Sequence, residues 1–361
     1  MSGRSPGVAG AGPAPRRIYV TDCEGPLTRN DNAQEIAARF IPDGADLFAR
    51  LSRYDDFLAD VVRKPGYNAG DTLRLLPPFL RAFDVTDEEV EAFSAEGVLL
   101  VPGAREALAE IGALLRTFII STSYTPYLRA LCELCGFPLR HVRCTELSLD
   151  AWLMPEDEKA WLRGEAARVM ERSLIEIPEE ASSADDLSPA DAVTVARLDD
   201  LFWTRMAGRV SGDLVAAVRP VGGGMKLAAL EDIVAAECVD GGDVMYVGDS
   251  ITDAPPLAAV KAWGGVALSF NGNGYALAAA ELAAASPDAG VAAELAKAFA
   301  GGGRSSVEAA VRAWPKPEEG EEPTGRGRAR VGLVAEEPEA LAEASAAARR
   351  SVRGERVARL G

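Results

Sequence analysis

The chain has 361 residues, with 38 Lys and Arg against 55 Asp and Glu, and its formal net charge is −17. Because so acidic a protein repels nucleic-acid phosphates and anionic lipid, we expect no nucleic-acid partner. The single histidine, His141, excludes mechanisms that need two histidines, and five cysteines do not predict a disulfide framework. No uncharged apolar run reaches the length of a membrane span, so we expect a cytoplasmic protein.

Residues 1–15 are rich in Gly and Pro, lack the apolar centre of a signal peptide and are expected to form a disordered tail. Four short apolar runs follow, each ending in small polar residues. They lack clean alternation, which is typical of strands buried on both faces of a parallel sheet. Helical patterns between them predict a doubly wound, Rossmann-like α/β core. The expected strands are 17–20, 117–120, 244–247 and 266–270, and the expected helices are 104–115, 126–135 and 227–239.

Two segments with helical apolar patterns, residues 31–97 and 147–218, interrupt this core. The core is therefore expected at 16–30, 98–146 and 219–300. Residues 301–361 change in composition, and we expect a linker followed by a charged helix. Arginines in this last segment indicate a solvated helix, which we favour, or a contact with nucleic acid or an acidic partner. They are Arg326, Arg328, Arg330, Arg349, Arg350, Arg353, Arg356 and Arg359.

Carboxylates follow two of the expected strands. Asp22 and Glu24 are two residues apart, so a tight turn can aim both at one volume, where one attacks as a nucleophile and the other moves a proton. Asp249 and Asp253 are four apart and, with Asp22, offer the carboxylates that Mg²⁺ accepts while it keeps several waters. The alternative for both pairs is a role in capping turns and helices.

Two further residues indicate an anion site. Lys226 opens the helix expected at 227–239, where a cation opposes the helix dipole and favours a nearby phosphate or the Asp22 carboxylate. Ser121, with Thr122 as a neighbouring candidate, precedes a helix start, where a hydroxyl and backbone N–H groups can bind an anion. A solvated lysine and a helix-capping serine are the alternatives.

The ordered set Asp-x-Glu, Ser, Lys and Gly-Asp-x-x-x-Asp resembles the haloacid dehalogenase (HAD) superfamily of phosphohydrolases, over about residues 16–30, 98–146 and 219–275. The resemblance implies Mg²⁺ as cofactor and an aspartyl-phosphate intermediate. It also implies a role for each residue. Asp22 would be the nucleophile, and Glu24 would be the general acid and base, with its main-chain carbonyl also ligating the metal. Ser121 or Thr122 would bind the phosphoryl group, and Lys226 would neutralise its charge. Asp249 would ligate the metal, and Asp253 would support the metal's waters or Lys226.

Two residues depart from the family's usual pattern: Glu24 replaces an Asp, and Pro26 replaces a Thr, for which Thr28 is a candidate substitute. Residues 22–33 also resemble the opening of proteins named energy-converting hydrogenase A subunit R, which belong to the same superfamily. That name implies association with a hydrogenase complex. Nothing in the sequence indicates nickel, an iron–sulfur cluster or a membrane contact.

The expected function is a Mg²⁺-dependent phosphatase acting on a small phosphorylated metabolite. The alternatives are a phosphotransferase to a small hydroxyl acceptor and a non-catalytic subunit or regulator of a larger, hydrogenase-like complex. The superfamily places a helical cap where residues 31–97 lie, and residues 147–218 are expected to be a structural or oligomerisation element. The oligomeric state and any partner stay open. Candidate substrate contacts in the cap, each more often an ordinary surface residue, are Arg53, Lys64, Tyr67 and Arg74.

The cysteines allow one further interpretation. Cys132, Cys135, His141 and Cys144 have the residue types of a zinc site. We favour a core position for these cysteines, because two of them share the apolar face of the helix expected at 126–135. Cys23, beside the expected nucleophile, is predicted to pack away from the site.

Overall fold

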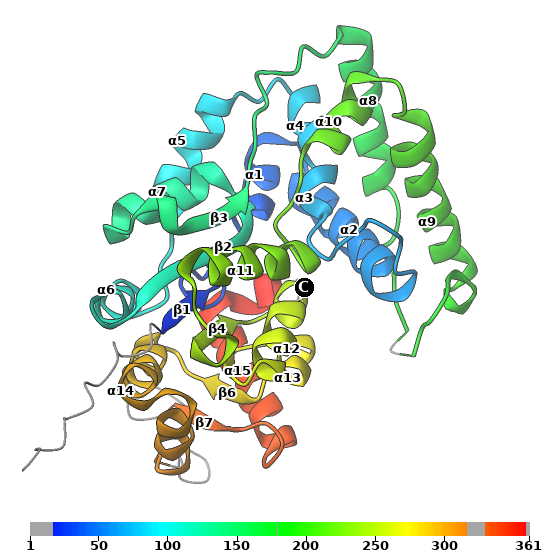
Figure 1. Cartoon of the computed structure of the whole chain (residues 1–361). Coiled ribbons are helices and arrows are strands. Elements are labelled where there is room, and N and C mark those ends of the chain that lie inside the picture. The colour runs from blue at the N-terminus through cyan, green and yellow to red at the C-terminus, as the bar shows by residue number, and fades with distance from the viewer. Residues whose placement is uncertain (1–16, 179, 316–328, 359–361) are drawn as a thin grey trace, which may run out of the picture.

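The computed structural model describes residues 17–178, 180–315 and 329–358, with side chains up to residue 354. Its centre is one sheet of seven strands within the described residues, in the order β3-β2-β1-β4-β5-β6-β7 (Figure 1). Every neighbouring pair is parallel except β6 and β7. The expected doubly wound, Rossmann-like α/β core is confirmed. The strands are β1 (Ile18–Thr21), β2 (Arg116–Tyr124), β3 (Val142–Thr145), β4 (Val244–Gly248), β5 (Val266–Phe270), β6 (Leu282–Ala285) and β7 (Arg330–Leu333).

Helices cover both faces of the sheet, which explains the continuous apolar runs in its strands. Ile18 and Val20 pack toward α11, α12 and α13, whereas Tyr19 between them packs toward α6, α7 and α14. The three helices predicted in the core lie within three residues of their expected bounds. The six helices that cover the sheet are α6 (Ala104–Leu114), α7 (Thr125–Cys135), α11 (Gly224–Glu237), α12 (Ala254–Ala262), α13 (Gly274–Ala279) and α14 (Gly290–Arg312).

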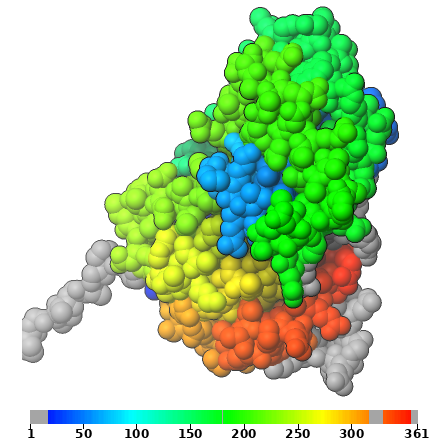
Figure 2. Space-filling model, turned by 90° about the vertical axis from the view of Figure 1, so that its right-hand side faces the viewer, coloured from blue at the N-terminus to red at the C-terminus, as the bar shows by residue number. Residues whose placement is uncertain are grey.

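The two interrupting segments form one helical domain, because a single hydrophobic cluster contains residues from both. Leu51 and Phe79 of the first segment and Leu162 and Phe202 of the second are all buried in it. Figure 2 shows this domain as a lobe against the core. Its helices are α1 (Asn32–Phe40), α2 (Gly44–Asp56), α3 (Thr72–Leu75), α4 (Pro77–Ala82), α5 (Asp87–Gly97), α8 (Glu156–Met170), α9 (Pro189–Asp200) and α10 (Val210–Ala217), with π-helical turns at Phe57–Val61 and Leu201–Arg205.

The C-terminal part contains the expected helix, but the segment expected as a linker holds further elements. Residues 304–312 form the last part of α14, beyond a kink at Gly302 and Gly303, and β7 adds an antiparallel strand at the sheet edge. Helix α15 (Pro338–Ala358) then packs along β6 and β7 and runs back toward the carboxyl ends of the strands. The rest of the expected linker, at 316–328, and the N-terminal tail at 1–15 lie outside the described residues. No helix in the described part is long and apolar enough to cross a membrane.

Candidate active site

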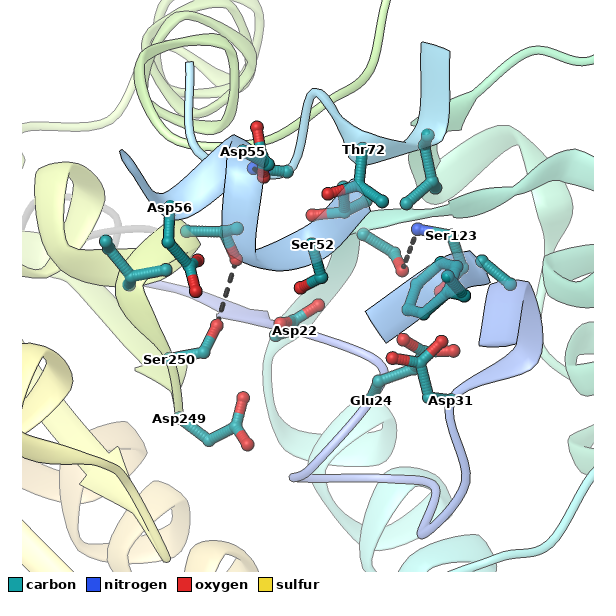
Figure 3. A pocket seen from close by; sticks show the side chains of 18 of the residues that line it. Asp22, Glu24, Asp31, Ser52, Asp55, Asp56, Thr72, Ser123, Asp249 and Ser250 are labelled. Atoms are coloured by element: carbon teal, nitrogen blue, oxygen red, sulfur yellow. Dashed lines mark hydrogen bonds between the residues drawn. The ribbon is translucent and has the colours of Figure 1, made fainter. Parts of the chain in front are cut away.

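The carboxyl ends of β1, β2 and β4 meet at one edge of the sheet, because β1 pairs in parallel with both neighbours. Asp22 and Asp249 directly follow β1 and β4, and Ser121 lies near the end of β2. All three line a cavity of about 110 Å³. Ser52 and Asp56 of α2 face Asp22 and Asp249 from the helical domain (Figure 3). Parallel α/β sheets bind their ligands at this edge.

Lys226 lies between two buried carboxylates. Its Nζ is 2.6 Å from Asp22 Oδ2 and 2.8 Å from Asp253 Oδ1, and its side chain is 0 % exposed. Burial by itself would lower the pKa of Lys226, but the two carboxylates outweigh it and raise the pKa. Burial and Asp253 raise the pKa of Asp22, while Lys226 opposes that rise. The lysine near the helix start therefore has the anionic neighbour that its position requires.

Asp253 holds this arrangement together. Its Oδ1 accepts hydrogen bonds from Lys226 and from the Tyr246 hydroxyl, and its Oδ2 accepts from the backbone N–H groups of Asp249 and Ser250. Burial would raise the pKa of Asp253, but Lys226 and these donors lower it. The contacts fit a support for Lys226 and for the loop after β4, one of the two roles expected for this residue.

Asp249 lies against the loop that carries Asp22. A Cβ atom on Gly25, which has a φ of +106°, would lie 2.2 Å from Asp249 Oδ2, so only glycine allows this close approach. Asp22, Asp249 and Asp253 each offer one oxygen within 4.8 Å of the others, and no other such group of His, Cys, Asp or Glu occurs among the described residues. A set of carboxylate oxygens suits a hard divalent cation.

Glu24 has the environment of a proton donor. Its Oε1 accepts a hydrogen bond of 2.9 Å from the Asn32 backbone N–H at the start of α1. Burial, together with the neighbouring Asp31 carboxylate, raises the pKa of Glu24 to about 8. A carboxyl group that keeps its proton near neutral pH can donate it to a leaving oxygen. Glu24 and Asp31 both line the cavity.

The end of β2 supplies polar groups to the same cavity. Ser121 Oγ accepts a hydrogen bond of 3.2 Å from the Ser123 N–H, and the buried Thr122 Oγ1 has no hydrogen-bond partner among the described residues. Strand β2 runs to Tyr124 through an irregular register rather than ending at Ile120 as expected. Thr28 does not line the cavity; its hydroxyl contacts Cys23 instead, so it does not replace the family's usual Thr.

Two arginines of α15 enter the site, which contradicts the prediction of a solvated C-terminal helix. Arg349 and Arg353 both contact Asp249, and their side chains are 4 % and 7 % exposed. The available signal was their spacing of four residues, which places both on one face of a helix. The sequence does not show which surface that face would meet.

The four candidate substrate contacts in the cap do not line the cavity. Lys64 and Arg74 lie over the ring of Trp203, and Tyr67 packs against the same ring edge-on. Arg53 forms an ion pair with Asp56 and donates a hydrogen bond to the Ile175 carbonyl of the second segment. These side chains join the two halves of the helical domain, where cation–π contacts and ion pairs satisfy them. The cap residues that line the cavity are Asp31, Ala33, Phe48, Ser52, Asp55, Asp56, Gly70, Thr72 and Leu73.

Cys132, Cys135 and Cys144 occupy core positions, as favoured. Cys132 is buried in the cluster between the sheet and α6, α7 and α14, and Cys135 and Cys144 pack against that cluster. His141 lies beside the ring of Phe118, with the ring centres 5.0 Å apart. Cys23 is also buried, with its Sγ toward Thr28. All five cysteines are free thiols.

Comparisons with known proteins find a chain of the same fold but do not give an activity. No family model and no curated protein matches the chain. A gene product of Archaeoglobus fulgidus is similar over 96 % of this chain and 99 % of its own, with 29 % identity and a TM-score of 0.81. A phospho-aspartyl intermediate analogue of phosphoserine phosphatase covers 74 % of this chain and 91 % of its own, with 14 % identity and a TM-score of 0.43. A probable phosphoserine phosphatase from Vibrio cholerae covers 79 % and 65 %, with 15 % identity and a TM-score of 0.42. Because both of these TM-scores lie below 0.5, we draw no functional conclusion from them.

Proposed function

We propose that the chain is a Mg²⁺-dependent phosphatase of the HAD superfamily, which hydrolyses a small phosphate monoester through an aspartyl-phosphate on Asp22. The observation that carries this proposal is the position of Lys226 between Asp22 and Asp253, in a cavity that Asp249 also lines. A carboxylate held by a buried cation, with a second carboxylate beside it, suits the transfer of an anionic phosphoryl group.

The residues of the site can perform both halves of the reaction. A carboxylate oxygen of Asp22 attacks phosphorus while the bond to the substrate oxygen breaks, and Glu24 gives its proton to that oxygen. Glu24, now a carboxylate, then takes a proton from a water molecule that attacks the same phosphorus. This releases inorganic phosphate and restores the Asp22 carboxylate. One group acting as acid and then as base suits a pKa of about 8.

Charge neutralisation falls to Lys226 and to the carboxylates that can hold a cation. Lys226 is already within 2.6 Å of the proposed nucleophile. When bound by Asp22 and Asp249, Mg²⁺ would supply the positive charge that lets one anion approach another. The Thr122 hydroxyl, buried without a partner in the described structure, offers a donor to the phosphoryl oxygens.

The helical domain lies over the site, which suits a small substrate. Residues of α2 and α3 line the cavity on the side opposite the sheet. A substrate held between the two domains is shielded from water, which strengthens the electrostatic interactions around it. The free thiols agree with a reducing compartment such as the cytoplasm. The link to the hydrogenase subunit R type stays a prediction from residues 22–33.

The test is phosphate release from a panel of small phosphate monoesters, with Mg²⁺ and with EDTA. We expect Mg²⁺-dependent turnover that Asp22→Asn lowers on the order of 10³-fold or more, because the amide cannot form the acyl phosphate. The control is Asp213→Asn, an exposed residue of α10, which should match the wild type. Circular dichroism checks that each variant folds. Unchanged turnover in Asp22→Asn, or in EDTA, would rule the proposal out.

A further inference from the structure

Helix α15 brings two buried arginine side chains to the carboxyl end of β4, where Asp249 lies. Arg349 and Arg353 are one helical turn apart, and Asp249 is a hundred residues earlier in the chain. Burying a charged group costs several kcal/mol unless a partner compensates it. Both guanidinium groups find that partner in the same carboxylate, which is itself 1 % exposed.

The two arginines share one oxygen of Asp249. Arg349 Nη1 and Arg353 Nη1 both contact Oδ2, the latter at 3.0 Å, and Arg349 Nη1 also donates to the Asp249 carbonyl at 3.1 Å. Among the described residues, nothing donates a hydrogen bond to the other oxygen, Oδ1. One oxygen is therefore fixed by the protein while the other is left for a ligand.

Arg353 also contacts the chain between the core and the cap. Its Nε donates to the Arg29 carbonyl at 3.2 Å, and its Nη2 donates to the Asn30 carbonyl at 3.4 Å. This segment leads from the loop of Asp22 into α1, the first helix of the helical domain. The planar guanidinium thus holds Asp249 with one donor and the entry to the cap with the other two.

We propose that Arg349 and Arg353 are positioning residues: they fix Oδ2 of Asp249 so that Oδ1 faces the cation, and Arg353 links that carboxylate to the segment entering the cap. This inference rests on the proposed function, in which Asp249 is a metal ligand. Ligating carboxylates are commonly hydrogen-bonded by outer groups, and loss of such a group typically weakens metal binding about 10–100-fold.

A different role for the arginines predicts the opposite sign. If the guanidinium groups occupied the place of the cation, removing either one would tighten metal binding. If they position Asp249, removal weakens it. The sign of the change in affinity therefore separates the two roles without any measurement of turnover.

The experiment is calorimetric titration of Mg²⁺ into the full chain, without substrate, for the wild type, Arg349→Gln, Arg353→Gln and Arg353→Lys. We expect the dissociation constant to rise about 10–100-fold in both Gln variants, and by less in Arg353→Lys, which keeps the charge but loses the fork. The control is Arg350→Gln, an exposed position on the same helix. Because Arg353 lies near the end of α15, its two variants keep the test available if Arg349→Gln does not fold.

Hydrogen exchange supplies a second readout. Arg353→Gln should raise amide exchange in peptides covering residues 29–34, whereas Arg349→Gln, which removes donors to Asp249 rather than to this segment, should not. Unchanged or tighter Mg²⁺ binding in the Gln variants would overturn the proposal. Wild-type binding without turnover on any substrate would count against the proposed function alone, and a wild type that binds no Mg²⁺ would overturn both.

Discussion

Lys226→Met removes the one positive charge between two buried carboxylates while keeping an apolar side chain of similar length. The lysine is 0 % exposed, Asp22 is 6 % exposed and Asp253 is 0 % exposed at the side chain. Removing one partner of a buried ion pair typically costs about 3–5 kcal/mol, because the charge that is left has no compensation. We expect a loss of this size in the free energy of unfolding, measured by urea denaturation in EDTA.

The loss should grow with pH. Without Lys226, burial and the Asp253 charge still raise the pKa of Asp22, and nothing nearby opposes them as strongly. Between about pH 4 and the raised pKa of Asp22, the folded variant then binds more protons than the unfolded chain, so its stability falls as the pH rises through this range. Unfolding curves at pH 5.5 and pH 8 should therefore show the larger difference from wild type at pH 8.

Lys159→Met is the matched control. Lys159 also contacts two carboxylates, Asp84 and Glu156, but their side chains are 54 % and 78 % exposed. Water can solvate these carboxylates once the lysine is gone, so the loss of stability should be much smaller and nearly independent of pH. Equal losses in the two variants, or a pH dependence of the opposite sign in Lys226→Met, would refute the electrostatic account of the site.

Two further predictions concern the proton donor and the tight loop. If Glu24 with a pKa of about 8 is the acid, kcat/KM should fall as the pH rises through about 8. Glu24→Gln should lower the activity about 10²–10⁴-fold, and its residual activity should not show that fall. A wild-type profile that is flat from pH 6 to 10 would exclude this role. Gly25→Ala should cost roughly 1–3 kcal/mol of stability from backbone strain and also weaken Mg²⁺ binding, because its Cβ would meet Asp249. Gly136→Ala, with a φ of +66° and open space around it, should lose stability only, and equal Mg²⁺ binding in both variants would contradict the steric argument.

The part of the site that follows the strands could be predicted from the sequence. In a parallel sheet each short apolar run ends at the same edge, so Asp22, Ser121 and Asp249 were expected together, and the structure has them there. The position of Lys226 follows from the glycines before it and the apolar pattern after it. Local signals were sufficient here because each residue is placed by the element that it directly follows or begins.

The edges of the sheet were harder to predict. Strand β6 is Leu-Ala-Ala-Ala and β7 is Arg-Val-Gly-Leu, and alanine and glycine have low strand propensity. Strand β6 is held extended by pairing with β5, β7 pairs with β6, and α15 packs against both strands. The packing of the two insertions against each other was equally hard to predict, because Leu51 and Phe202 share one hydrophobic cluster although 151 positions separate them in the sequence. A single sequence shows that such residues are buried but not which ones pack together.

The arginines of α15 are the clearest case, since charged residues on a helix are usually solvated. Their partner, Asp249, is distant in sequence, and only the fold brings them together. Once they are included, the carboxylates of Asp22, Asp249 and Asp253 face an equal number of cations: Lys226, Arg349 and Arg353.

This charge balance affects how the site would bind Mg²⁺ and a phosphate monoester. A divalent cation alone adds two positive charges to these six side chains, whose formal charges cancel, whereas a phosphate monoester near neutral pH carries close to two negative ones. Binding both together restores the balance, so each should favour the binding of the other. The arginines of α15 would therefore make the two ligands cooperate: the site binds Mg²⁺ alone, and substrate should tighten that binding.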